Sequence, residues 1–326
     1  MKLRIGSRGS QLALWQAKAI AGLLRVQGHD VEIEIIKTTG DRLQEVTFAQ
    51  VGAMTGSKGM FTKEIEEALA EGRIDLAVHS LKDLPTELPE PFALAATPVR
   101  VDPRDVFVSV KHANLAALPL GARVGTSSQR RRAQLKGLRL DLDLVEFRGN
   151  VDTRLRKLAE GQVEAILLAA AGLDRLGRTD WVRERLSPKE FCPAAGQGAL
   201  GIETRKRDAV TIEAVSFLDH ADTRFAVAVE RAALAALGGG CQVPIGIHCR
   251  PKRFESGEDA NETRPCDEVF AVVASPSSGA TVRVYHQAVR EKNDPEALGR
   301  QIAAMLIEAG AGPLLAAVGE APGGAA

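Results

Sequence analysis

Aromatic side chains and cysteines are scarce in this chain of 326 residues. Phenylalanine, tryptophan and tyrosine make up 4% of it, and only one residue is a tyrosine. The four cysteines include no C-x-x-C pair, and the six histidines are scattered without the spacing of metal ligands. We therefore expect no metal site and, in a reducing compartment, no disulfide framework.

Net charge and long apolar runs are lacking as well. Lysine plus arginine equals aspartate plus glutamate, at 42 each, so no overall field attracts nucleic acid or an anionic membrane. No apolar run reaches the length of a membrane span, and the first residues predict a strand rather than a signal peptide. We expect a soluble cytoplasmic protein, with 45% hydrophobic residues to build two or three cores.

The segment Ile74–Pro85 is the most informative stretch of the chain. An apolar run ends in a His-Ser pair and places Lys82 beside Asp83, where an open α/β sheet carries its chemistry. Ser80 and Asp83 are also spaced as a helix cap and its acidic partner, which would explain both without any function. Because a proline stops such a helix after about one turn, we expect the Lys-Asp pair to face a ligand.

Short stretches of the first hundred residues return in the second hundred. Arg-Ile-Gly-Ser at 4–7 returns as Arg-Val-Gly-Thr at 123–126, where a strand turns into a helix. Leu-Ala-Glu-Gly at 69–72 returns at 158–161, where a helix ends before a buried strand. A third echo, a basic residue followed by glycine, lies between them. This order predicts two lobes of one α/β design, with mixed sheets, that face each other across a cleft.

Composition divides the chain into these two lobes and a smaller domain. Prolines between residues 85 and 103 predict a crossing between the lobes. The glycine-rich turn at 196–201 precedes an apolar run that would return to the first sheet. Antiparallel strands are predicted at 269–275 and 280–289, with a last helix after Asp294. The expected divisions are residues 1–99 with 197–215 for the first α/β lobe, 100–196 for the second, and 216–326 for an α+β domain.

Three further expectations concern local structure. The polar loop Thr38–Gly59 is long for a connection, so we expect it to be mobile or functional. The polar stretch 250–265 predicts a surface insertion. Ser10 caps a predicted helix whose apolar residues fall on one face; these residues are Leu12, Trp15, Ala19 and Leu23.

Basic residues crowd the segment between 123 and 157. Runs of charge usually mark a solvated helix face, but residues 126–128 (Thr-Ser-Ser) precede a predicted helix, whose free N–H groups favour an anion. Arg130 and Arg131 follow within its first turn. Successive helix positions point about 100° apart, so three arginines cannot all face one ligand, and we expect Arg132 in solvent.

Other arginines occur at similar strand-to-helix turns. Arg148 precedes the predicted cap Asn150, Arg154 lies one turn further on, and Arg8 with Ser10 repeats the pattern in the first lobe. Guanidinium groups bind carboxylates through paired hydrogen bonds, so a ligand with several carboxylates fits both walls of the cleft. Nucleic acid is not expected, because no aromatic residues interleave the arginines to stack bases.

Cys241 differs from the other cysteines in its surroundings. A lone cysteine is most often a small buried apolar residue. Three glycines precede Cys241 and Val-Pro-Ile-Gly follows it, which favours an exposed loop. A thiolate there could form a covalent bond, particularly if neighbouring arginines lower its pKa. The loop alone does not identify the bonded group.

Taken together, these motifs resemble the porphobilinogen deaminase family, also called hydroxymethylbilane synthases. The resemblance covers residues 3 to 250 closely and the last domain in outline. The matching motifs include Arg8-Gly-Ser10, Lys58-Gly-Met-Phe61, His79-Ser-Leu-Lys-Asp83, Asp102-Pro-Arg-Asp105, Gly125-Thr-Ser-Ser128, Arg148-Gly-Asn150, Gly196-Gln-Gly198 and Gly240-Cys-Gln-Val-Pro-Ile-Gly246.

The resemblance implies two lobes of the periplasmic-binding-protein type and a monomeric transferase of tetrapyrrole biosynthesis. Its activity would condense four porphobilinogen molecules head to tail into hydroxymethylbilane, with loss of ammonia. A dipyrromethane cofactor, bound to Cys241 through a thioether, would prime the chain. Asp83 would be catalytic, assisting departure of the aminomethyl nitrogen and stabilising the cationic azafulvene.

The remaining implied site residues hold acetate and propionate groups. For the cofactor they are Ser10, Lys58, Lys82, Thr126, Ser127, Ser128, Arg130 and Arg131; for the substrate they are Arg8, Arg148, Arg154, Arg175 and Gln197. The loop at 52–57 is longer than the usual glycine turn of the family, and the resemblance implies no role for the stretch 250–265. An alternative function is a non-enzymatic, two-lobed carboxylate-binding protein, which needs the arginines but neither Asp83 nor Cys241.

Overall fold

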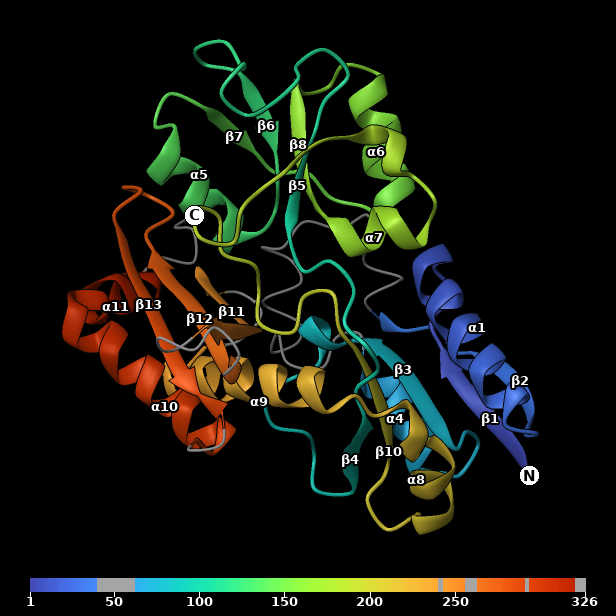
Figure 1. The fold of residues 1–326 in the computed structure, drawn as a ribbon. Helices are drawn as coiled ribbons and strands as arrows, with labels where there is room; N and C mark the ends of the chain where they lie inside the picture. The colour runs from blue at the N-terminus through green and yellow to red at the C-terminus, as the bar shows by residue number, and fades with distance from the viewer. Residues whose placement is uncertain (40–61, 240–242, 256–262, 291–292, 320–326) are drawn as a thin grey trace.

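The computed structural model describes residues 1–39, 62–239, 243–255, 263–290 and 293–319. Three sheets organise these residues, with two five-stranded sheets in the first two thirds of the chain and a three-stranded sheet near its end (Figure 1). No helix within the described ranges is both long and apolar enough to cross a membrane. The expected α/β class with a small α+β part is confirmed.

The first sheet has the order β2-β1-β3-β10-β4. β1 runs parallel to β2 and β3, whereas β10 runs antiparallel to β3 and β4. The strands are β1 (Lys2–Ser7), β2 (Asp30–Ile35), β3 (Leu76–Ser80), β4 (Phe92–Ala96) and β10 (Leu200–Arg205). The accompanying helices are α1 (Gln11–Val26), α4 (Lys63–Ala70), the 3-10 turn η1 (Leu81–Asp83), α8 (Ala209–Val215) and η3 (Ser216–Leu218).

The second sheet repeats this plan in the order β7-β6-β8-β5-β9. β6 is parallel to β7 and β8, and β5 is antiparallel to β8 and β9. The strands are β5 (Asp105–Val108), β6 (Arg123–Gly125), β7 (Asp143–Val145), β8 (Ala165–Ala169) and β9 (Val182–Arg185). The helices are α5 (Gln129–Leu138), α6 (Val151–Ala159), α7 (Ala170–Arg175) and η2 (Thr179–Trp181).

The sequence echoes occupy equivalent places in the two sheets. The Asp75 carboxylate accepts the backbone N–H of Arg4 at 2.8 Å, just before β3. In the second lobe the Glu164 carboxylate accepts the backbone N–H of Arg123 at 2.7 Å, just before β8. An acidic side chain thus extends the parallel ladder by one hydrogen bond in each lobe. The expectation of two lobes of one design is confirmed.

Two segments carry the chain between the sheets, from β4 to β5 and from β9 back to β10. They touch where the Val101 N–H donates to the Gly198 carbonyl at 3.3 Å. Gly198 has a φ of +87°, and a Cβ atom there would lie 2.6 Å from the Val101 carbonyl oxygen. Only glycine combines this conformation with this approach.

The C-terminal part packs helices on one antiparallel sheet of order β11-β12-β13. Its core includes Val229, Ile247, Val273 and Ile302. Asp294 caps α10 as expected, accepting the Ala297 N–H at 2.8 Å. The elements are α9 (Ala221–Ala236), β11 (Ile245–Glu255), β12 (Thr263–Ala274), β13 (Thr281–Val289), α10 (Pro295–Leu306), η5 (Ile307–Ala311) and α11 (Gly312–Gly319).

Residues 250–255 and 263–265 extend β11 and β12 as paired strands, and residues 250–252 are exposed; that this stretch is an insertion stays a prediction. One local expectation was wrong. In α1 the buried face is not the one carrying Trp15 and Leu23, which are 41% and 47% exposed. The face against the sheet carries smaller side chains that allow close packing, together with Ile20 and Leu24; the buried residues are Gln16, Ala17, Ile20, Ala21 and Leu24.

Candidate active site

Strand β3 ends in the turn η1, which presents Lys82 and Asp83. Leu81 and Leu84 are buried on either side, and the Leu81 N–H donates to the Ala199 carbonyl at 3.0 Å, so the turn is held from both ends. Asp83 between them is exposed. The expected stop after one turn is confirmed.

The capping explanation of this motif is wrong. Ser80 makes no side-chain cap to the turn. Its hydroxyl oxygen instead accepts a hydrogen bond from Gln16 Nε2 of α1 at 2.8 Å. Since Asp83 supports no helix there, its exposed carboxylate is available for chemistry.

Lys82 lies among charges from both lobes. Its Nζ is 3.4 Å from Gln197 Oε1. Burial lowers the pKa of Lys82 to about 8, the charge of Asp83 opposes this, and Arg131 and Arg130 of the other lobe reinforce it. Gln197, which Lys82 Nζ approaches, also donates to Asp105, the partner of both arginines, so the turn and α5 lie close enough for their charges to interact.

Arg130 and Arg131 converge on a carboxylate that the sequence did not single out. Asp105, fully buried at the start of β5, accepts from Arg130 Nη1 at 2.6 Å and from Arg131 Nη2 at 2.7 Å and Nε at 3.0 Å. Burial alone would raise the pKa of Asp105, but the two guanidinium charges hold it well below its usual range. Asp105 belongs to the Asp-Pro-Arg-Asp motif, from which the sequence predicted only a crossing between the lobes.

The two arginines are therefore largely turned inward. Arg130 and Arg131 are 5% and 6% exposed, and each also donates to a backbone carbonyl, of Cys192 at 2.7 Å and of Leu167 at 3.0 Å. Their remaining N–H groups are the part that can reach a ligand. The third arginine of the run, Arg132, is half-buried rather than in solvent, and its Nη1 lies 3.5 Å from the Thr126 carbonyl.

Gln197 connects the two lobes through its side-chain amide. Its Nε2 donates to the Pro103 carbonyl at 2.7 Å and to Asp105 Oδ1 at 3.1 Å. Its Oε1 faces the Lys82 ammonium. A chain of contacts therefore runs from half-buried Lys82 through Gln197 to Asp105 and on to the two arginines.

The hydroxyl groups before α5 serve as acceptors within the lobe. Ser128 caps α5 by accepting the Arg131 N–H at 3.4 Å. Ser127 accepts the Phe147 N–H at 3.0 Å, and Thr126 accepts the Ser128 N–H at 3.3 Å. Because a hydroxyl is both acceptor and donor, these contacts orient each oxygen while its proton can still point to an anion.

Arg154 and Arg175 have no carboxylate partner within ion-pair distance among the described residues. Arg154 Nε donates to the Gly149 carbonyl at 2.8 Å, and Arg175 Nη2 donates to the Gly198 carbonyl at 2.9 Å. Burial lowers the pKa of each to about 10, with Arg131 and Arg148 adding to the shift for Arg154. Desolvated cations without an anion favour binding one, so both are candidate carboxylate receptors.

The other expected residues are more solvated or lie outside the described ranges. Arg148 is paired with Glu146 at 2.6 Å. Arg8 is half-buried after β1, and Ser10 caps α1 by accepting the Ala13 N–H at 3.3 Å. Lys58, Cys241 and the loop at 52–57 fall outside the described residues.

Comparisons with known proteins agree along the chain. A family model described as "Porphobilinogen deaminase, dipyromethane cofactor binding domain" matches residues 3–213, and one described as "Porphobilinogen deaminase, C-terminal domain" matches residues 224–308. A porphobilinogen deaminase of Nitratidesulfovibrio vulgaris (strain Miyazaki F) is 47% identical over 97% of each chain. Another, of Trichlorobacter lovleyi, is 56% identical over 76% of this chain and 78% of its own. The solved methionine-binding protein MetQ aligns at 15% identity and a TM-score of 0.43, over 71% of this chain and 94% of that one.

Proposed function

Since this chain belongs to the porphobilinogen deaminase family, we propose that it is a transferase that condenses four porphobilinogen molecules head to tail into hydroxymethylbilane, releasing ammonia. The observation in the fold that supports this best is the pair Arg154 and Arg175. Both are desolvated, and in the described part of the chain they donate to backbone carbonyls rather than to carboxylates. The substrate, a pyrrole with acetate and propionate side chains, supplies the missing anions.

The donor set also suits a dipyrromethane cofactor, whose rings carry the same acidic side chains. Lys82, the three hydroxyl groups at 126–128 and the N–H groups of Arg130 and Arg131 that are not used within the lobe come from both lobes, and all can donate hydrogen bonds to a carboxylate. We propose that they hold the cofactor together with Ser10 and Lys58, and that Cys241 anchors it through a thioether. When bound, the cofactor supplies the pyrrole carbon to which the first substrate is joined.

Asp83 is proposed as the catalytic carboxylate. Departure of ammonia leaves positive charge on the substrate ring, and an exposed carboxylate on a firmly held turn stabilises that charge. The same group takes up the proton that a ring carbon loses after the new carbon–carbon bond forms. The surrounding guanidinium groups bind carboxylates, so Asp83 is the anion left to face the cationic centre.

Arg8, Arg148, Arg154 and Arg175 are proposed to bind the substrate's carboxylates. Gln197 is proposed to keep Lys82 of the first lobe aligned with the arginines of the second, through the hydrogen bonds to Asp105 and Pro103. A bidentate guanidinium fixes the plane of a carboxylate as well as its position. Substrate orientation would therefore come from the arginines and charge stabilisation from Asp83.

Intact-protein mass spectrometry tests the cofactor assignment. The purified protein is expected to exceed its sequence mass by one dipyrromethane, with the added mass on the peptide that contains Cys241. A Cys241→Ala variant should lack that mass. A fully folded protein that carries the sequence mass alone and consumes no porphobilinogen would instead favour the carboxylate-binding alternative.

Asp83→Asn tests the catalytic assignment. This variant is expected to keep the added mass but to lose at least about a hundredfold in turnover, the usual contribution of a positioned acid–base group. Its matched control is Asp152→Asn, at a partly exposed carboxylate in the first turn of α6, which should retain normal turnover. Near-normal turnover of Asp83→Asn would remove the assignment.

The domain division at 1–99 with 197–215, 100–196 and 216–326 is retained as a proposal. The return of β10 to the first sheet supports its discontinuous first lobe. Limited proteolysis with mass mapping would test it through cuts near residues 100, 196 and 216. A monomer in the cytoplasm is also proposed; light scattering during gel filtration and cell fractionation test these two statements.

A further inference from the structure

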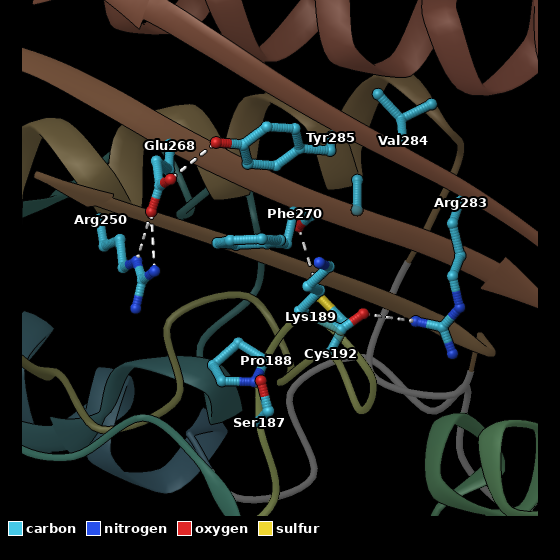
Figure 2. A pocket seen from close by; sticks show the side chains of 11 residues that line it. Ser187, Pro188, Lys189, Cys192, Arg250, Glu268, Phe270, Arg283, Val284 and Tyr285 are labelled. Carbon is cyan, nitrogen blue, oxygen red and sulfur yellow. Dashed lines mark hydrogen bonds and ion pairs between the residues drawn. The ribbon is translucent and has the colours of Figure 1, made fainter. Parts of the chain in front are cut away.

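A cavity of about 530 Å³ lies between the C-terminal sheet and the segment 187–192 of the second lobe (Figure 2). Phe270 of β12 and Tyr285 of β13 line its sheet side, and Pro188 and Cys192 line the facing side. Its volume lies within the range of small-molecule sites. Neither Asp83 nor any of the proposed substrate-binding residues lines it.

The sheet side of the cavity offers aromatic surface. The ring centroids of Phe270 and Tyr285 are 5.2 Å apart and tilted, and the guanidinium of Arg250 lies 5.3 Å from the centroid of Phe270. Phe270 is 8% exposed and lies behind Tyr285, which is 51% exposed, so Tyr285 presents the surface on which a flat ring can stack with an offset.

The one carboxylate that lines the cavity is already matched by donors. Glu268 accepts hydrogen bonds from Arg250 at 2.9 Å, Lys252 at 2.7 Å and the Tyr285 hydroxyl at 2.7 Å. Burial alone would raise the pKa of Glu268, but these three groups lower it to about 2. The Glu268 carboxylate therefore stays ionised, with its charge balanced by Arg250 and Lys252, and a ligand needs no cation to pair with it.

Two cations at the cavity have no ion-pair partner in the described part of the chain. The Lys189 side chain makes no hydrogen bond or ion pair there. Arg283 donates only to backbone carbonyls, of Lys189 at 3.4 Å and of Glu190 at 2.8 Å. Positive charge beside an aromatic wall favours a ring that carries negative groups.

We propose that this cavity binds a flat aromatic ring bearing carboxylates, with the ring stacked on Tyr285 and the carboxylates at Lys189 and Arg283. The pyrrole carboxylates of the proposed function belong to this chemical class, as do benzene carboxylates.

Cys192 connects such a ligand to the arginine cluster. Its thiol lies 3.3 Å from the Phe270 carbonyl at the cavity. Its own carbonyl accepts from Arg130 Nη1 at 2.7 Å and from Gln134 Nε2 at 3.0 Å. A ligand that displaces the segment 187–192 therefore moves the Cys192 carbonyl, which together with Asp105 accepts from Arg130 Nη1. Occupancy of the cavity changes how the arginines receive substrate, a consequence that rests on the proposed function.

The single tyrosine of the chain allows a direct binding test. With tyrosine replaced by meta-fluorotyrosine, the fluorine NMR spectrum reports only on Tyr285, in the cavity wall. Isophthalate is expected to shift this resonance saturably, and the neutral isophthalamide to bind at least about tenfold more weakly. If the resonance shows no saturable shift at about 10 mM isophthalate, any binding is weaker than that of a small fragment, and the proposal is overturned.

Variants locate the bound carboxylates. Lys189→Met should weaken isophthalate about three- to tenfold, as loss of one partly exposed charge pair does. Because this side chain makes no hydrogen bond in the described structure, the variant should fold normally. Lys18→Met, at an exposed position of α1, is the matched control and should bind as the parent protein does. Equal affinities of the two variants would place the ligand elsewhere and refute the assignment.

Turnover measurements test separately whether a ligand in the cavity affects substrate binding at the active site. Isophthalate at a concentration near its Kd for the parent protein should raise the KM for porphobilinogen there, and raise it less in Lys189→Met, whose cavity is then less occupied. An equal rise in KM in both proteins would mean that isophthalate competes at the active site, and no rise would mean that occupancy of the cavity does not affect the arginines. Either result refutes the proposed link through Cys192. A protein with no turnover at all would count against the proposed function while leaving the fluorine titration as an independent result.

Discussion

Replacing Asp105 by asparagine tests whether this buried carboxylate holds the arginine cluster together. Asp105 is fully buried and accepts three hydrogen bonds from two guanidinium groups, which are themselves 5% and 6% exposed. Asparagine keeps the shape but leaves two like charges buried without a counterion. Breaking a buried ion pair in this way costs about 3–5 kcal/mol. We expect the lower end, about 3 kcal/mol, because the amide oxygen still accepts one bond.

Guanidinium chloride unfolding, followed by tryptophan fluorescence to which Trp181 of the second lobe contributes, measures this loss as a lower transition midpoint. The matched control is Asp143→Asn, whose carboxylate is 58% exposed and 3.6 Å from Arg123. An exposed pair of this kind contributes at most about 1 kcal/mol. Adding Arg131→Met to Asp105→Asn should recover part of the loss, because it removes one uncompensated charge.

The effect should not depend on pH between 5 and 8. The pKa of Asp105 is held below its ordinary value, so its stabilisation is complete above the unfolded pKa of about 3.9 and is lost only as pH falls toward the folded value. A loss under about 1 kcal/mol, or one equal to that of Asp143→Asn, would refute the view that Asp105 is the counterion of the cluster.

The remaining predictions concern the ligand side of the site. Arg154→Met should raise the KM for porphobilinogen at least about tenfold without lowering the stability of the ligand-free fold, because Arg154 is desolvated and forms no ion pair among the described residues. The control is Arg156→Met, because Arg156 lies on the same helix with its side chain 64% exposed. Equal KM values for the two variants would contradict the proposal that Arg154 binds a substrate carboxylate. Because the pKa of Lys82 is lowered to about 8, its ammonium is lost as pH rises through that value, so KM should increase between pH 7 and 9 in the parent protein and stay flat in Lys82→Met. A parallel rise in both proteins would assign the titration to another group.

Part of the site was predictable because it depends on neighbours in the chain. The turn at Lys82 and Asp83 follows from a strand run, two polar residues and a proline within one segment. The caps Ser10, Ser128 and Asn150 follow from the same local rule, since each accepts an N–H three residues ahead. The exposure of Asp83 was predictable for this reason, whereas its contacts with a substrate stay a prediction.

Other features depended on partners far along the chain. The arginines after residue 129 were expected to face a ligand, yet much of their hydrogen bonding goes to Asp105, more than twenty residues away in sequence. In α1 two sides of the helix carry apolar residues, so the pattern showed an apolar face without showing which face meets the sheet. Glu230 likewise joins Arg100 of one crossing segment to Gly196 of the other, with no local signal.

The sequence by itself determined the class of the fold, the repetition of the α/β unit and the family, because these rest on short patterns and on their order along the chain. Tertiary structure alone decided which guanidinium groups are matched by Asp105 and which, like Arg154 and Arg175, are left with no carboxylate partner among the described residues. The physical reason is that a charge is neutralised by whatever the fold brings within a few ångströms, and sequence separation does not limit that distance.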